Sequence, residues 1–132
     1  MRREVQFLTL VEVIEIHKDQ IALYGGGSGM RDIRLLESAI AMPCQTFGNS
    51  YLHKDLFEMA SAYAYHISEN QPFVDGNKRV GLASALVFLE LNGISLNDAN
   101  GRLLEAIRKV STGKMDKQAL SAVLRDVWRH HI

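Results

Sequence analysis

The chain has 132 residues, of which 47% are hydrophobic, and its fifteen basic side chains balance fifteen acidic ones. That length and apolar content suit one domain with its own core, so we expect a single domain over residues 1–132. Because the net charge is zero, the protein has no overall electrostatic field that would attract nucleic acid or an anionic membrane surface. No apolar run approaches the roughly 18 residues of a membrane span. We therefore expect no nucleic-acid partner, no membrane and a cytoplasmic location.

Helical periodicity dominates the sequence, and the alternation typical of strands is scarce. Thr9 and Glu12 have the spacing of a capping box, which predicts a helix that ends at Gly25-Gly26. A second helix is expected at about 32–42, before a proline, and a third at about 54–69. The segment between these two is expected to be a polar, flexible connection.

The next predicted helix follows the polar loop 71–79, and apolar side chains cover most of its circumference, which is typical of the centre of a bundle. Asn92-Gly93 has the chemistry of a left-handed C-cap, and a short extended piece is expected at 94–96. Two amphipathic helices are predicted after it, at about 99–110 and 116–128. The expected fold is therefore all-α, a bundle of about six helices around a central apolar helix.

The loop before the central helix has the composition of an anion site. The first free N–H groups and the positive dipole end of the helix converge there. Gly76 allows close approach of the backbone to a ligand, and Lys78 and Arg79 add positive charge. Asp75 would repel a phosphate unless a cation bridges the two, which is a usual way to hold Mg²⁺, and Phe73 is the expected apolar anchor of the loop. The same residues also fit an ordinary turn with a capping aspartate, so taken alone they leave both interpretations open.

The run Gln71-Pro72-Phe73-Val74-Asp75-Gly76-Asn77-Lys78-Arg79 resembles the signature loop of the Fic/Doc superfamily, His-x-Phe-x-Asp/Glu-Gly/Ala-Asn-Gly/Lys-Arg. It agrees with that pattern at every position but the first. Segments elsewhere resemble the death-on-curing (Doc) branch, and the likeness covers nearly the whole chain: 24–26, 29–32, 35–39, Pro43 and 85–93. The resemblance implies a Fic/Doc helical domain.

By matched residue, the resemblance implies a site for ATP and Mg²⁺. Asp75 would hold the Mg²⁺, and Asn77 with the amides after it would bind phosphate. Gly76, Lys78 and Arg79 would complete the phosphate site. The implied reaction is transfer of a group from ATP to a protein hydroxyl.

Two positions bear on which group is transferred. Fic enzymes that transfer AMP usually have glycine at the position of Lys78 and a further arginine at the position of Leu82. This chain has neither, so the resemblance favours phosphate transfer, as in the Doc branch, with AMP transfer as an alternative. The typical target of that branch is a hydroxyl of translation elongation factor Tu, whose phosphorylation halts protein synthesis. The implied biology is the toxin of a toxin–antitoxin pair.

Position 71 departs from the family pattern. The family has a histidine there, which takes the proton from the target hydroxyl as it attacks phosphorus. Gln71 can orient a hydroxyl but cannot accept its proton near neutral pH, so we expect this molecule to be inactive or strongly impaired. A natural degenerate copy and an introduced substitution both explain the glutamine. His66, about 7.5 Å back along the preceding helix and on another face, is a disfavoured substitute base.

Regulation would come from a second protein. The Ser/Thr-x-x-x-Glu-Gly/Asn motif of self-silencing Fic enzymes does not occur in the sequence. The resemblance therefore implies a cognate antitoxin whose disordered C-terminal segment folds on the toxin. A rival hypothesis is a catalytically dead binding module for antitoxin or nucleotide, and the simplest alternative is a helical bundle with an accidental turn.

Other residues are given structural roles. The single cysteine, Cys44, cannot form an internal disulfide and is expected to be a small buried apolar side chain. The glycine-rich run 25–29 lacks the Lys-Ser/Thr of a P-loop and is predicted to end the first helix. Arg31 is expected to tie this turn down as an ion-pair partner, and His130-His131 is expected to be a solvated tail.

Overall fold

The computed structural model of the chain describes residues 4–98 and 100–129. Within these ranges the regular structure consists of helices and a single two-stranded hairpin, which confirms the all-α prediction: α1 (Leu10–Tyr24), α2 (Ile33–Ala41), β1 (Thr46–Phe47), β2 (Ser50–Tyr51), α3 (Leu56–Asn70), α4 (Asn77–Leu91), α5 (Arg102–Ser111) and α6 (Lys117–Arg129). The expected helix start at Ala99 and the tail at His130-His131 lie outside the described residues. In the described part of the chain, no helix is both long and apolar enough to cross a membrane.

Local capping signals set where the helices begin. The Glu12 N–H donates to Thr9 Oγ1 at 3.2 Å, and the Thr9 N–H donates to Glu12 Oε1 at 2.8 Å, so the predicted capping box is present. Asp55 accepts from the Glu58 N–H at 2.8 Å at the start of α3. These bonds form within a few residues of chain, which is why the helix starts were predictable from sequence.

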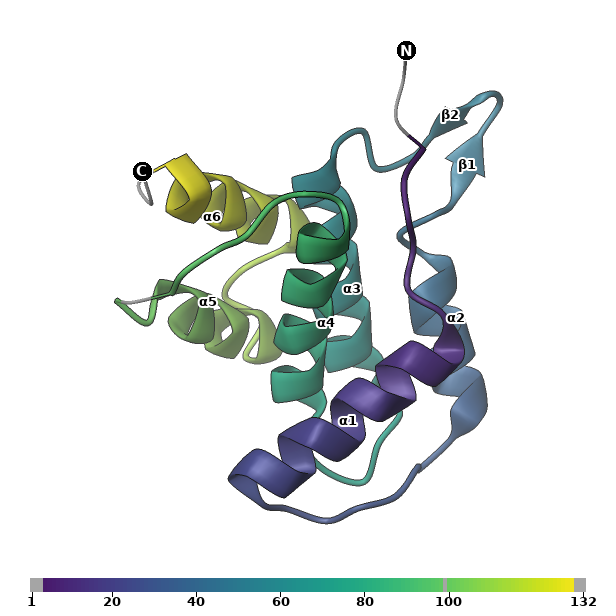
Figure 1. Cartoon of the computed structure of the whole chain (residues 1–132), viewed down its shortest axis with the longest axis vertical. Helices are drawn as coiled ribbons and strands as arrows, with labels where there is room; N and C mark the ends of the chain where they lie inside the picture. The colour runs from purple at the N-terminus through teal and green to yellow at the C-terminus, as the bar shows by residue number, and fades with distance from the viewer. Residues whose placement is uncertain (1–3, 99, 130–132) are drawn as a thin grey trace.

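The packed pair α3 and α4 forms the centre of the molecule. Figure 1 shows α1 lying across the end of α4 where the chain enters it, with α2 on one side of the pair and α5 and α6 on the other. Close approach of α3 and α4 depends on Gly81, because a Cβ there would lie 2.8 Å from the Ala64 carbonyl oxygen. The central apolar helix was thus correctly predicted.

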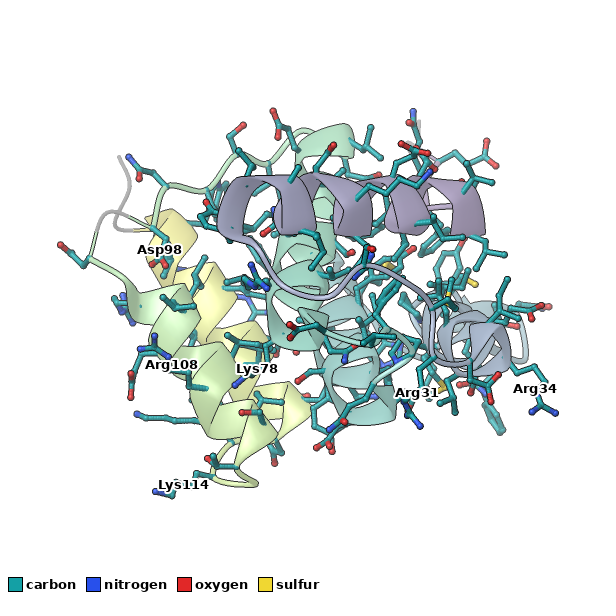
Figure 2. The ribbon with its side chains drawn as sticks, turned by 90° about the horizontal axis from the view of Figure 1, so that it is seen from below. Arg31, Arg34, Lys78, Asp98, Arg108 and Lys114 are labelled. Atoms are coloured by element: carbon teal, nitrogen blue, oxygen red, sulfur yellow. The ribbon has the colours of Figure 1, made fainter. Side chains whose placement is uncertain are left out.

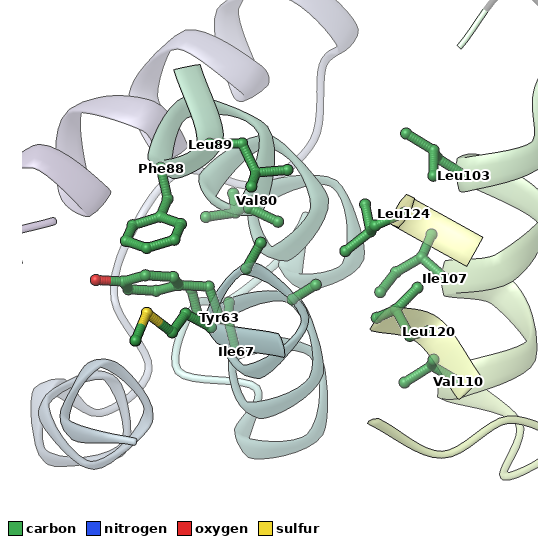
Figure 3. Close-up of a cluster of buried hydrophobic side chains, with 14 of the residues drawn as sticks. Tyr63, Ile67, Val80, Phe88, Leu89, Leu103, Ile107, Val110, Leu120 and Leu124 are labelled. Atoms are coloured by element: carbon green, nitrogen blue, oxygen red, sulfur yellow. The ribbon is translucent and has the colours of Figure 1, made fainter. Parts of the chain in front are cut away.

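Buried side chains on both sides of α3 and α4 make up the core. Tyr63 and Phe88 pack with ring centroids 5.2 Å apart, and both are fully buried. Figure 3 shows these rings beside Ile67 and Val80, with a second group of aliphatic side chains from α5 and α6 facing the same two helices. The first group joins α3 to α4 and the second packs α5 and α6 against this pair, so the core sets the position of α4.

Two local expectations were wrong, whereas the short extended piece expected at 94–96 is assigned to neither a helix nor a strand. The connection at 46–51 is a hairpin, with Thr46 opposite Tyr51, and its two-residue strands are too short to produce an alternating pattern. Cys44 is exposed rather than buried, because it lies in the turn that ends α2 and its thiol donates to the Ala41 carbonyl at 3.6 Å.

Candidate active site

Two loops that are distant in sequence lie against each other at the end of the bundle where α4 begins. Met30 and Phe73 form an isolated antiparallel bridge, and the Val74 N–H donates to the Gly29 carbonyl at 3.1 Å. The loop after α1 therefore supports the loop before α4. This pairing was not predicted, because it joins segments more than forty residues apart.

The first turn of α4 presents backbone N–H groups without intrahelical partners. Gly76 is the N-cap, with φ 79° and ψ 16°, and no side chain among the described residues caps the helix. The first bond of the helix runs from the Val80 N–H to the Gly76 carbonyl at 2.9 Å, so the N–H groups of Asn77, Lys78 and Arg79 remain free of it. The dipole and these N–H groups make the turn suited to an anion.

Asp75 is exposed beside this turn. Its Oδ2 accepts from the Gly27 N–H at 3.2 Å, and its Oδ1 accepts from the Gly76 N–H at 2.8 Å. The pKa of the Asp75 carboxyl lies below its usual range. The largest cause is the hydrogen bond from the Gly27 N–H, followed by the bond from the Gly76 N–H and then by the positive charge of Arg79. The carboxylate is therefore ionised at neutral pH.

Phe73 and His17 fix the loop from behind. Phe73 is 2% exposed, and its ring stacks on the buried His17 ring with centroids 3.9 Å apart and planes 5° apart. His17 Nε2 lies 3.0 Å from the Asp75 carbonyl oxygen, and because a carbonyl only accepts, this nitrogen carries the proton. His17 thus holds the backbone of Asp75, a contact that no local sequence signal indicated.

Asn77 closes the loop on itself. Its Oδ1 accepts from the Phe73 N–H at 3.0 Å, and its Nδ2 donates to the Phe73 carbonyl at 3.1 Å. The side chain of Asn77 therefore shapes the loop, and its backbone N–H is the group left for an anion.

The two cationic side chains differ in their surroundings. Arg79 donates from Nη2 to the Gly25 carbonyl at 3.0 Å, and its guanidinium lies 5.8 Å from the centroid of the Tyr24 ring. Lys78 is exposed and has no hydrogen-bond or ion-pair partner in the described part of the chain, on the side of the bundle where α5 lies (Figure 2). Arg79 is thus anchored to the end of α1, while Lys78 is free to reach a ligand.

An open pocket of about 570 Å³ is lined by most of the predicted site residues. It is lined by the loop 74–79, by Gln71, by Ser68 and Glu69 from the last turn of α3, and by Ser111 and Thr112 from the end of α5. Gln71, Asp75, Gly76, Asn77, Lys78 and Arg79 all line it, whereas Phe73 lies behind the loop. The two hydroxyl residues of α5 were missed by sequence reasoning, because only the packing of α5 brings them to the pocket.

His66 does not line this pocket. Its Nε2 lies 3.1 Å from Lys117 Nζ at the start of α6. Burial, then the Lys117 and His53 charges, lowers the pKa of His66 to about 4. The structure gives no support to His66 as a substitute for the missing base.

A helical domain whose central helix opens on a pocket with free amides, an ionised carboxylate and two cations belongs to the class of phosphate-handling proteins. The chain belongs to the Fic/DOC family, whose sequence model matches residues 7–89, a stretch that runs from α1 through most of α4. This confirms the resemblance inferred from the loop.

Two curated relatives resemble most of the chain. A protein named Toxin Doc from Mycolicibacterium smegmatis is 33% identical over 104 residues, which cover 76% of this chain and 79% of the relative. A protein named Protein kinase doc from Escherichia phage P1 is 31% identical over 117 residues, which cover 89% of this chain and 91% of the relative. The similarity thus extends well beyond the loop.

Proposed function

We infer that this chain is a Doc-type toxin built as a phosphotransferase, with ATP as phosphate donor and a protein hydroxyl as acceptor. The names of the two relatives, Toxin Doc and Protein kinase doc, support this assignment. The observation that carries it is the uncapped start of α4, which opens into a pocket beside the ionised Asp75. Because the Doc branch typically acts on elongation factor Tu, we propose that factor as the target and, with it, a cytoplasmic location.

The phosphates of ATP would be bound by the free N–H groups of the first turn of α4, with Lys78 as the mobile cation. Arg79 would contribute charge from its anchored position against α1. Lys78 occupies the position where AMP-transferring relatives have glycine, and Leu82 the position of their additional arginine, which favours phosphate over AMP transfer.

Mg²⁺ fits the donor set at Asp75. The carboxylate is exposed and ionised, each oxygen accepts only one N–H bond, and an anion site adjoins it. The ion would neutralise charge on the transferred phosphoryl group. Gly27 and Gly76 orient the carboxylate for this role through their N–H groups.

Gln71 occupies the place of the general base. Gln71 lines the pocket, and its side-chain amide can donate or accept a hydrogen bond, so it could orient an acceptor hydroxyl. Its amide cannot take the proton of that hydroxyl, so we expect transfer to be slower by about 10² to 10⁴ than with a base in place.

The first test is Gln71→His. We expect the variant to arrest bacterial growth and to transfer label from γ-labelled ATP to elongation factor Tu about 10²-fold or more faster than the glutamine form. The double variant Gln71→His with Asp75→Ala is the inactive control. A Gln71→His protein that folds, spares growth and transfers no label would contradict the proposal, and label from α-labelled ATP would indicate AMP transfer instead.

A second candidate is a binding module without catalysis, which the glutamine itself favours because Gln71 leaves the phosphate and carboxylate groups intact. This candidate predicts that Gln71→His changes neither growth nor transfer, while ATP still binds. The Gln71→His experiment therefore distinguishes the two proposals.

An antitoxin is the proposed protein partner. A largely apolar groove of about 560 Å³ lies between α1, α4 and α5, with Leu82, Leu86 and Ile107 in its wall and Lys78 and Arg108 at its edge. A disordered C-terminal segment that folds on binding, with apolar and acidic side chains, fits such a groove. Leu86→Asp should weaken antitoxin binding in a pull-down without changing the pocket at Asp75.

A further inference from the structure

The residue at the base position has an unusual backbone conformation. Gln71 has φ 50° and ψ 57°, and it is the only non-glycine among the described residues with positive φ. Residues with a Cβ rarely adopt this left-handed backbone conformation, and Pro72 restricts the backbone of Gln71 further. A conformation of this kind persists only where surrounding groups hold it.

The Gln71 N–H donates to the Ile67 carbonyl at 3.1 Å and the Asp32 N–H to the Pro72 carbonyl at 3.0 Å, but Arg31 makes the most bonds to this segment. Its Nε donates to the Gln71 carbonyl at 2.8 Å, and its Nη2 donates to the Asn70 carbonyl at 3.0 Å. Its backbone N–H donates to the Pro72 carbonyl at 2.7 Å. One residue therefore binds three successive carbonyls, and the rigid fork of the guanidinium determines the angle between two of them.

The conformation turns the chain where it leaves α3, and residue 71 lines the pocket together with Asp75 and Lys78. Arg31 itself is absent from the pocket lining, and its guanidinium bonds to this segment go to the backbone carbonyls of Gln71 and Asn70. Arg31 therefore acts on the orientation of residue 71 and, among the described residues, makes no hydrogen bond or ion pair with the proposed phosphate and metal ligands. The sequence-based expectation of an ion pair at Arg31 was wrong, because its partners are carbonyls.

We propose that Arg31 is a positioning residue that locks position 71 in the left-handed conformation and thereby aims the side chain of the base position at the reacting hydroxyl. The catalytic half of this inference rests on the proposed function, whereas the conformational half does not. The competing explanation is an ordinary cation at the C-terminal end of a helix, which adds stability and nothing else.

Arg34 provides a matched control. It is an arginine on the same segment, but it pairs with Asp32 at 3.3 Å and extends away from the body of the molecule (Figure 2). The variants are Arg31→Ala, Arg31→Lys and Arg34→Ala. Arg31→Lys keeps the charge but loses the fork, and it serves if Arg31→Ala does not fold.

The first experiment uses the chain with Gln71 and needs no activity. A positive φ brings the Hα of a residue close to its own N–H, so NMR should show a strong intra-residue cross-peak at Gln71. We expect this cross-peak to weaken in both Arg31 variants and to stay unchanged in Arg34→Ala. An unchanged cross-peak in a folded Arg31 variant would overturn the proposal.

The second experiment introduces the same variants into Gln71→His and measures phosphate transfer. We expect Arg31→Ala to lower kcat by about 10²-fold with KM for ATP within about twofold, Arg31→Lys to recover part of the loss, and Arg34→Ala to match the parent. Equal losses in kcat from Arg31→Ala and Arg34→Ala, or a loss confined to KM, would reject the positioning role. Failure of Gln71→His itself to transfer phosphate would reject the proposed function and leave the NMR result to decide the conformational claim.

Discussion

Asp75 depends on close contact with a glycine turn that belongs to another part of the chain. A Cβ built on Gly26 would lie 2.7 Å from Asp75 Oδ2, and Gly26 has φ 115°. Only glycine permits the turn after α1 to approach the carboxylate, and the neighbouring Gly27 N–H then bonds it. The glycine run, predicted as a helix stop, is therefore also part of the pocket's support.

At this scale we predict that Gly26→Ala displaces Asp75. Thermal unfolding should show a loss of about 1–3 kcal/mol, and Mg²⁺-dependent nucleotide affinity should fall about tenfold or more, because the added methyl group collides with the carboxylate. Gly25→Ala is the control, since its φ is 80° but nothing lies within 4 Å of the added Cβ. Gly25→Ala should lose only the stability that a positive φ costs an alanine, and it should keep its nucleotide affinity. An equal loss of affinity in both variants would count against the prediction.

The elements differ in how they contribute to the site. The end of α3 provides position 71, and the start of α4 provides the proposed anion site. The helix α1 and its C-cap hold both Arg79 and, through His17, the backbone of Asp75. Away from the pocket, His66 on α3 and Lys117 at the start of α6 lie half-buried beside each other, and His53, just before α3, is buried. These groups bear on stability and not on the proposed chemistry.

The half-buried His66 and the buried His53 make stability depend on pH. Because burial lowers the pKa of His66 from 6.5 to about 4, the unfolded chain binds more protons than the folded chain between those values. Stability is therefore fully present above about pH 6.5 and declines as the pH falls towards 4, by about 1 kcal/mol after allowance for the partial exposure of the ring. His53, whose pKa burial also lowers, acts in the same direction.

Denaturant unfolding from pH 7.5 down to pH 4.5 measures this dependence. His66→Gln should flatten the decline, because the titrating group is removed while a hydrogen-bonding side chain remains beside Lys117. The same pH slope in the variant and in the parent chain would show that His66 does not contribute.

As a whole molecule, the protein combines a packed helical core with the pocket at the start of α4 and a glutamine at the proposed base position. The core holds the first turn of α4 independently of residue 71. Binding and transfer should therefore respond to different substitutions, which is the behaviour expected when one group of a site is lost and the others remain.

At this scale we predict that the chain with Gln71 still binds ATP with Mg²⁺. Saturating ligand, at about 100 times Kd, should add about 2.7 kcal/mol to the free energy of unfolding, which is visible as a rise in Tm. Asp75→Ala should reduce the Mg²⁺-dependent part of the shift. Asp19→Ala, an exposed carboxylate on α1, should keep all of it, and no shift in the parent chain would support the bundle with an accidental turn.

The sequence by itself determined the helices, their starts, the central apolar helix and the loop motif, because capping boxes, helical periodicity and motif spacing act over a few residues. Only the tertiary structure decided which residues support the loop. Contacts of His17 with Asp75, Arg79 with Gly25 and Arg31 with Gln71 span 58, 54 and 40 residues. In all three contacts the side chain donates to a backbone carbonyl, and because every residue carries such a carbonyl, no side-chain pattern marks the partner in advance.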